Sequence, residues 1–136
     1  MPGNDTLHLL TKNGKHEFRV DLQRFNGQKG YAKYSSFAVG GEESKYKLSV
    51  SGHSGIDDSL IHHSGMRFTT KDQDNGLSSS NCTVHYIGGW WYESCYRSNL
   101  KGLYAQSPMK SNKNNKWYSW FHKALKRSTM MMRPSV

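Results

Sequence analysis

The stretch that most constrains the fold of this chain is "NCTVHYIGGWWYESC", residues 81–95. It holds both cysteines, Cys82 and Cys95, and two of the four tryptophans of the chain. The hydrophobic content of the chain, 35%, is low, and its aromatic residues partly compensate because each buries a large area. The Gly-Gly pair at 88–89 would let the adjacent tryptophans pack closely against the backbone.

The sequence allows three interpretations of the two cysteines. A disulfide between Cys82 and Cys95 would close a short loop and stabilise the fold by ~3 kcal/mol in the chain-entropy model. A zinc site would combine both thiols with His85 and a distant ligand such as His122, but that spacing is typical of no common zinc module. A pair of buried free thiols is the third alternative. A disulfide would indicate an oxidising compartment.

The first half of the chain predicts an antiparallel meander. A short helix is expected to begin with Asn4 or Asp5 as its N-cap and to end at Asn13-Gly14. Apolar and polar residues then alternate with the period of half-buried strands. The candidate strands are 16–25, 30–39 and 44–52. The segment 40–43 between the last two fits a hairpin loop, so residues 16–51 are expected to form three neighbouring strands.

Turn residues dominate from 52 to 81, and this segment is too long for a plain connector. Within it, "KDQDNGLSSSNC" places Asp72 and Asp74 one residue apart among Gly, Ser and Asn. Such loops offer the carboxylate and carbonyl oxygens that calcium prefers. An EF-hand is excluded because Thr83 stands where its bidentate Glu is required. An Asx-rich turn without a metal is the alternative.

The net charge of +9 is unevenly distributed, because no Asp or Glu follows Arg97. The segment from Arg97 onward would attract polyanions such as nucleic acids, sulfated glycans or acidic membranes, although a solvated basic face is the plainer explanation. The lysines do not follow one helix, so a specific nucleic-acid module is not expected. No apolar run approaches the ~18 residues of a membrane span. The first residues lack the pattern of a signal peptide.

Several segments together resemble the fibrinogen-related domain, the C-terminal globe of fibrinogens, ficolins, tachylectins and angiopoietins. They are "AKYSSFAVG", "YKLSVSG", "GMRFTTKDQDN", "NCTVHYIGGWWYESCYRSNLKGLY" and the closing "MMMRPS". The similarity extends over nearly the whole chain. It implies an α+β fold with a central antiparallel sheet, short helices and a loop-rich C-terminal recognition subdomain.

The resemblance also divides the chain. Residues 1–60 match the central sheet subdomain, 61–124 the recognition subdomain, and 125–136 a returning strand that Pro134 ends. The family domain is longer, so we expect this chain to lack the N-terminal subdomain. Loss of neighbouring strands exposes backbone edges, and poor stability of the chain alone is expected for that reason.

Similar domains bind calcium through two alternate aspartates and two later carbonyls. In this chain Asp74 matches the first aspartate, Gly76 stands at the second position, and Ser78 and Ser80 match the carbonyl donors. Asp72 is the candidate to replace the missing carboxylate. We therefore expect Ca²⁺ binding to be weak or lost.

In lectin-type members an acetyl-binding pocket lies beside the calcium loop and includes a cis peptide before the second cysteine. The residues that the resemblance assigns to ligand binding are Tyr86, Trp91, Ser94, Cys95, Tyr96 and Tyr104. Tyr96 stands where the family often has His. Asn112-Lys113 matches the slot for the acetyl methyl group, and a lysine would place a charge in it.

The resemblance implies a secreted, extracellular recognition module of innate immunity, a lectin whose partners are glycans or acetylated ligands. A protein–protein interaction module, as in fibrin assembly or receptor binding, is the first alternative. A truncated domain without binding of its own is the second. Neither the residues nor the resemblance supplies a nucleophile or an acid/base pair, so an enzyme is not expected. Any oligomerisation is expected through regions outside this chain.

Overall fold

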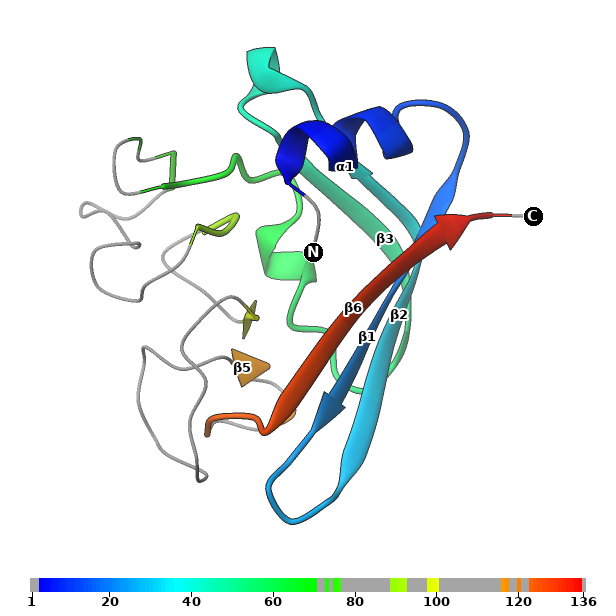
Figure 1. Cartoon of the computed structure of the whole chain (residues 1–136), viewed down its shortest axis with the longest axis vertical. Helices are drawn as coiled ribbons and strands as arrows, with labels where there is room; N and C mark the ends of the chain where they lie inside the picture. The colour runs from blue at the N-terminus through cyan, green and yellow to red at the C-terminus, as the bar shows by residue number, and fades with distance from the viewer. Residues whose placement is uncertain are drawn as a thin grey trace.

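The computed structural model describes residues 3–70, 73, 75–76, 89–92, 98–100, 116–117, 120 and 123–135. Figure 1 shows their arrangement. The helices are α1 (Asn4–Thr11) and two 3₁₀ turns, η1 (Glu42–Ser44) and η2 (Ile61–His63). The strands are β1 (His16–Gln23), β2 (Lys29–Val39), β3 (Leu48–Gly55), β4 (Ser98–Asn99), β5 (Lys116–Trp117) and β6 (Arg127–Pro134).

The main sheet has the order β3-β2-β1-β6, and every neighbouring pair is antiparallel. The predicted meander of three strands is therefore confirmed. β6 returns from the far end of the sequence to pair with β1 along its whole length, from His16 opposite Pro134 to Gln23 opposite Arg127. A strand in this closing segment was also predicted. β4 and β5 form a separate two-stranded ladder.

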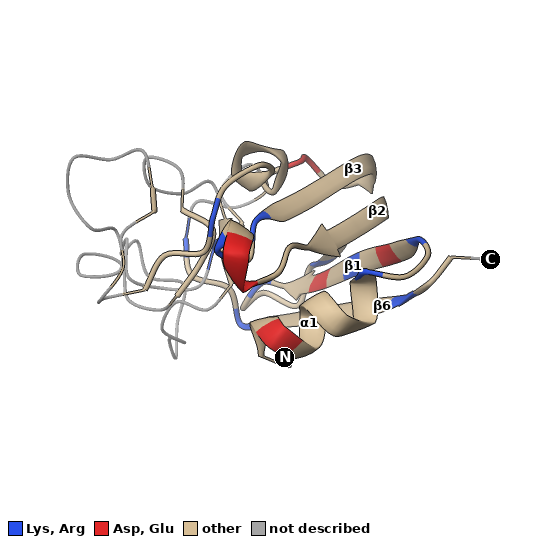
Figure 2. Cartoon of the chain, turned by 90° about the horizontal axis from the view of Figure 1, so that it is seen from above, with Lys and Arg blue, Asp and Glu red and all other residues tan. Residues whose placement is uncertain are grey.

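One face of the sheet carries the core. On β1 the alternation of Phe18, Val20 and Leu22 turns these three side chains inward, and all are buried. They belong to one hydrophobic cluster that also contains Trp90 and Trp91 from a loop segment and Trp117 from β5. Both views place the described loop segments at one side of the four strands (Figures 1 and 2). The sheet and the aromatic segment thus share a single core.

The helix differs from its prediction at both ends. Its N-cap is Gly3 rather than Asn4 or Asp5, and no side chain caps it. The Asp5 carboxylate instead accepts a hydrogen bond from the Tyr46 hydroxyl at 2.7 Å, so it serves a tertiary contact. The helix ends at Thr11, before the predicted stop. Among the described residues, no helix has the length and apolar character needed to cross a membrane.

The third strand also differs from its prediction. The alternation that included Tyr46 suggested an earlier start, but β3 begins at Leu48 and continues to Gly55. Lys45 and Tyr46 both have φ near +56°, which is left-handed backbone and ends the η1 turn. The predicted loop at 40–43 is thus extended by this left-handed pair. Gly52, at φ +72°, lets β3 continue where a Cβ would meet Ser35.

Candidate functional site

The adjacent tryptophans form the base of the candidate site. Trp90 and Trp91 are 1% and 2% exposed, and their rings meet edge to face with centroids 5.2 Å apart. The Phe68 ring meets Trp91 in the same way, also at 5.2 Å. A Cβ on Gly89 would come within 2.7 Å of the Phe68 ring. Glycine is therefore required there for the close packing that the sequence predicted.

A backbone carbonyl of the left-handed turn holds Trp91. The indole N–H donates to the Tyr46 carbonyl oxygen at 2.7 Å. The carbonyl of Lys45, the other left-handed residue, accepts from the Phe68 N–H at 2.9 Å. Left-handed backbone costs ~1–2 kcal/mol per non-glycine residue. The two hydrogen bonds give this turn a specific role, because they fasten it to Trp91 and Phe68. We call the packed rings of Phe68, Trp90 and Trp91 the aromatic base.

His63 joins two separate segments of the site. Its side chain is fully buried, with Nδ1 2.8 Å from the Trp91 carbonyl oxygen and Nε2 3.1 Å from the Ser98 backbone nitrogen. A backbone N–H can only donate, so Nε2 is the acceptor. The imidazole proton therefore lies on Nδ1 and is donated to Trp91. His63 thus fixes the chain just before and just after residues 93–97.

Burial lowers the pKa of His63 to about 4 from its ordinary 6.5. The hydrogen bond to the Trp91 carbonyl acts in the opposite direction, and burial outweighs it. His63 is consequently neutral at physiological pH. Neutrality is required by the geometry, because a protonated Nε2–H would face the Ser98 N–H donor.

The sheet positions His63 through Asp58. One carboxylate oxygen of Asp58 accepts from the backbone N–H groups of Leu60 and Ile61 at 3.1 and 3.0 Å, at the start of η2. The same oxygen accepts from the buried Tyr34 hydroxyl of β2 at 2.5 Å. Burial, the largest cause, and this bond raise the pKa of Tyr34, so its hydroxyl remains a donor. A chain of hydrogen bonds therefore links β2 to η2 and places His63.

The start of the acidic segment lies against the aromatic base. Thr69 and Trp90 pair through two backbone hydrogen bonds of 2.9 and 3.3 Å. Asn75 donates its backbone N–H to the Thr69 hydroxyl at 2.9 Å and its side-chain amide to the Phe68 carbonyl at 2.8 Å. The structure thus brings the flank of the predicted calcium loop next to the tryptophans.

Most of the predicted site residues lie outside the described residues, and their roles stay predictions. These residues are Asp72, Asp74, Ser78, Ser80, Cys82, Tyr86, Ser94, Cys95, Tyr96 and Tyr104. Gly76 is described and half-buried. Trp91 is described and buried, and its indole N–H donates to the Tyr46 carbonyl. In the described part of the chain, no three His, Cys, Asp or Glu side chains form a group that could hold a metal ion.

Sequence reasoning did not single out His63. His63 is buried, whereas the neighbouring His62 is exposed. A signal did exist, because both lie in the long segment that was expected to have a function. The pattern of residues did not distinguish the two, since burial of His63 depends on partners distant in sequence.

The shared core, the returning strand and the fastened aromatic base define a fibrinogen-like globe. The sequence matches the family described as "Fibrinogen beta and gamma chains, C-terminal globular domain" over residues 2–135, and the chain belongs to this family. The resemblance and the α+β fold inferred from the sequence are thereby confirmed.

Particular relatives and solved structures agree with this assignment. Ryncolin-4 of Cerberus rynchops is 40% identical over 137 residues, which cover 97% of this chain and 40% of the relative. "Fibrinogen C domain-containing protein 1" of Homo sapiens is 43% identical over 141 residues, 97% of this chain and 31% of the relative. The chain thus spans less than half the length of these curated relatives.

Among solved structures, the fibrinogen-like globe domain of human ANGPTL6 superposes with a TM-score of 0.94 at 30% identity, covering 98% of this chain and 63% of that one. Lamprey fibrin D-dimer, complexed with the peptide ligand Gly-His-Arg-Pro-amide, gives a TM-score of 0.91 at 25% identity, covering 97% of this chain and 49% of that one.

Proposed function

We propose that this chain is the ligand-recognising part of a secreted, extracellular fibrinogen-like lectin that binds acetylated sugars or related glycans. The observation that carries the proposal is the double anchorage by His63, which bonds to Trp91 and to Ser98. These bonds fix both ends of the segment that holds Ser94, Cys95 and Tyr96. Fixing a binding segment in advance reduces the entropy that a ligand must remove on binding.

The acidic segment would support the same site. Its flank is fastened to Trp90 through Thr69, and Asp74 with the carbonyls of Ser78 and Ser80 is the proposed set of Ca²⁺ ligands. We expect the affinity for Ca²⁺ to be low, because Gly76 supplies no carboxylate. Asp72 is the proposed substitute. Isothermal titration of Asp72→Ala with Ca²⁺ should show no remaining binding, and tight binding by this variant would contradict the substitution.

Recognition of a peptide or protein is the second candidate. The lamprey fibrin D-dimer, whose fold this chain shares, was solved with a short peptide ligand. Both candidates place the ligand on the same anchored segment, so binding measurements have to separate them.

The test is titration of the chain with N-acetylated monosaccharides, with and without Ca²⁺, beside titration with the peptide Gly-His-Arg-Pro-amide. Saturable binding of an acetylated sugar supports the lectin proposal. Binding of the peptide alone would replace it with the second candidate. His63→Gln should weaken sugar binding by about tenfold, because the segment loses one of its two anchors. His62→Gln is the matched control and should bind as the unchanged chain does.

A further inference from the structure

The face of the sheet that points away from the core is strongly basic. On β1, burial of Phe18, Val20 and Leu22 turns the residues between them outward. Directly paired residues of neighbouring strands point to the same side of a sheet. The outward residues of β1 and their partners on β2 and β6 therefore form one surface, the outer face. Its cations are Arg19, Lys29, Lys33, Arg127 and Arg133.

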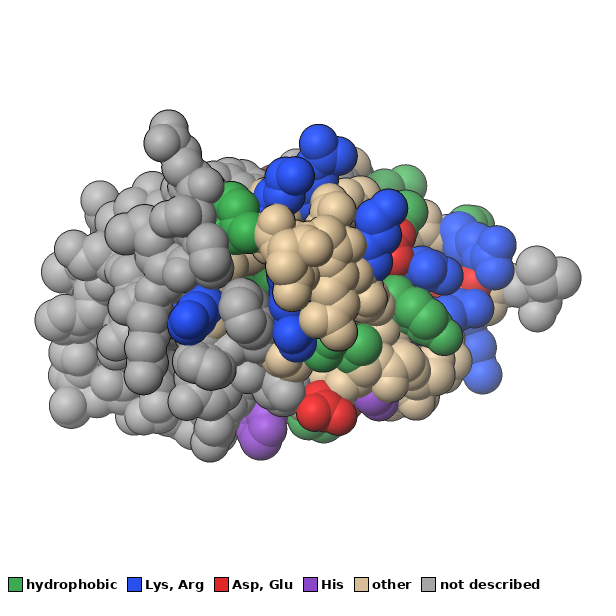
Figure 3. Space-filling view, turned by 90° about the horizontal axis from the view of Figure 1, so that it is seen from below, with side chains coloured by type: hydrophobic (Ala, Val, Ile, Leu, Met, Phe, Trp, Pro, Cys, Tyr) green, Lys and Arg blue, Asp and Glu red, His purple; other side chains and the backbone are tan. Residues whose placement is uncertain are grey.

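The two carboxylates of the outer face are already neutralised. Asp21 pairs with Arg19 at 2.9 Å, and Glu17 pairs with Arg133. No ion pair within the described residues uses Lys29, Lys33 or Arg127. These three side chains therefore keep their positive charge available to an external anion. Figure 3 shows basic side chains predominating over acidic ones on the described surface toward the C-terminus.

One pair on this face places two cations directly opposite each other. Arg19 and Lys33 stand directly opposite each other on β1 and β2, and like charges in that position are destabilising. The Arg19 guanidinium also lies over the ring of Tyr31, 4.4 Å from its centroid. Lys33 forms no ion pair among the described residues, and its charge acts at longer range on Glu17, where it helps to lower the pKa of that carboxyl after the larger effect of Arg133. A local arrangement that disfavours folding is expected where the surface serves another purpose.

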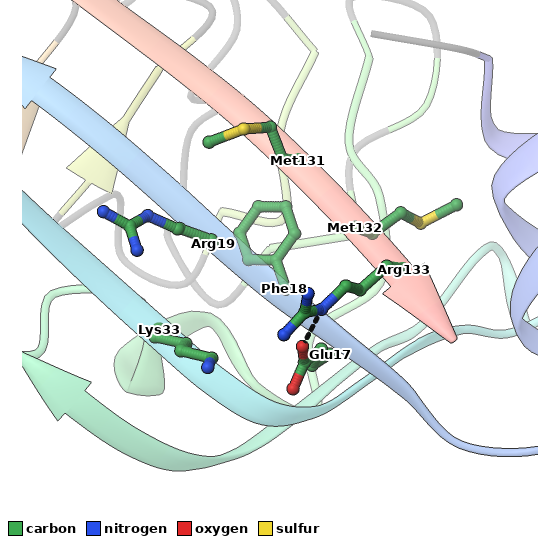
Figure 4. Close-up of a pocket in the computed structure, with 7 residues that line it drawn as sticks. All are labelled: Glu17, Phe18, Arg19, Lys33, Met131, Met132 and Arg133. Carbon is green, nitrogen blue, oxygen red and sulfur yellow. Dashed lines mark hydrogen bonds and ion pairs between the residues drawn. The ribbon is translucent and has the colours of Figure 1, made fainter. Parts of the chain in front are cut away.

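Two hollows follow β1 along this face. The first, of about 230 Å³, lies among Glu17, Arg19, Lys33, Met131 and Arg133, and Figure 4 shows these side chains around it. The second, of about 400 Å³, continues along the strand. Its lining includes Arg19, which both hollows share, and also Asp21, Lys29, Tyr31, Arg127 and Thr129. Together they form a groove with cations of β2 on one side and cations of β6 on the other.

The spacing of the cations indicates the kind of polyanion. Lys29 and Lys33 are four residues apart on one strand, which corresponds to ~13 Å at 3.3 Å per residue. Duplex DNA carries one charge per ~1.7 Å of its axis, so this face would leave most phosphates unmatched. Glu17 and Asp21 are each paired with an arginine, and their carboxylate oxygens can also accept hydrogen bonds from hydroxyl groups. The face suits anions that are separated by hydroxylated rings.

We propose that the outer face binds a linear sulfated polysaccharide along the groove beside β1. The sulfates contact Lys29, Lys33 and Arg127, and the sugar hydroxyls meet the neighbouring carboxylates. This site is separate from the segment anchored by His63 and does not depend on the proposed acetyl recognition.

The test uses immobilised heparin and a pair of charge-matched variants. Lys29→Glu/Lys33→Glu reverses two cations of the outer face. Lys12→Glu/Lys47→Glu reverses two exposed lysines at the end of α1 and before β3, away from this face. We expect the first variant to bind heparin about tenfold or more weakly, with a flatter salt dependence because two contacts are lost. The control should change less than about twofold.

Several outcomes decide the proposal. Equal weakening by both variants would overturn it, because net charge alone would then explain binding. Duplex DNA binding as tightly as heparin would overturn the assignment to a polysaccharide. The variant Lys29→Gln/Lys33→Gln provides a second test if charge reversal impairs folding, and it must also weaken heparin binding. Lys29→Glu/Lys33→Glu should bind acetylated sugars as the unchanged chain does, because the two sites are separate. If the chain binds no acetylated sugar, the heparin measurements still test the outer face.

Discussion

The sheet and the aromatic base of the candidate site are held together in different ways. In the sheet, each of the strand pairs β1–β2, β1–β6 and β2–β3 repeats the same backbone hydrogen bonds over many residues. Around Trp91, a few buried polar side chains each bond to the backbone of a distant segment. Single substitutions should therefore affect the aromatic base more than the exposed positions of the sheet.

The largest effect is expected for His63→Leu. Leucine fills a similar volume but leaves the Trp91 carbonyl and the Ser98 N–H without partners. A buried group without its hydrogen bond costs ~1–3 kcal/mol, so the free energy of unfolding should fall by ~3 kcal/mol or more. Urea unfolding measures this loss. His62→Leu, at the exposed neighbouring position, should change stability by less than ~0.5 kcal/mol, and an equal loss in both would contradict the comparison.

Acid should weaken the same contact without any substitution. The pKa of His63 is about 4 in the folded chain and 6.5 for an ordinary histidine. As the pH falls, His63 therefore binds a proton in the unfolded chain before it does so in the folded chain. The stability that neutral His63 contributes is complete above pH 6.5 and decreases as the pH falls toward 4. The loss amounts to ~3 kcal/mol, at about 1.4 kcal/mol per pKa unit.

Denaturant unfolding between pH 7 and pH 4 measures this loss, with His63→Gln as the control. The variant has no imidazole, so its stability should vary less over this range. If the unchanged chain and the variant show the same slope, other groups account for the pH dependence.

The accuracy of sequence reasoning differed between the same two regions. The alternation on β1 predicted both the strand and its buried face, because that pattern depends on nearest neighbours. Tyr46 continued such an alternation but lies in left-handed backbone, held by Asp5 and Trp91 from distant segments. In the site, the close packing of the tryptophans beside Gly89 was predicted, because it depends on the size of the indole rings and on the missing side chain of glycine. The role of His63 was not, because it depends on partners that folding alone brings near.

An intermediate effect is expected for Trp91→Phe. Phenylalanine keeps an aromatic ring against Phe68 but removes the N–H that donates to the Tyr46 carbonyl. We expect a loss of ~1–3 kcal/mol from the buried carbonyl that remains without this donor, together with lower ligand affinity. Thermal unfolding measures the stability. An unchanged melting temperature would indicate that the left-handed turn does not need this bond.

The smallest effect, of opposite sign, is expected on the sheet. Lys33→Glu places a carboxylate directly opposite Arg19 and removes the repulsion between two cations, which should outweigh the loss of the attraction between Lys33 and Glu17. A favourable cross-strand pair contributes roughly 0.2–1 kcal/mol, so the variant should be slightly more stable. Lys33→Gln should give about half of this gain. A loss of stability in Lys33→Glu would show that the lysine makes a contact that supports the fold.

The most direct test of the central role of His63 is nuclear magnetic resonance of its imidazole in the folded chain. The structure requires the neutral form at pH 7, with the proton on Nδ1 and the Ser98 amide protected from hydrogen exchange. The ring should reach half-protonation only near pH 4. A His63 that carries its proton on Nε2, or that titrates near 6.5 with an unprotected Ser98 amide, would contradict the account.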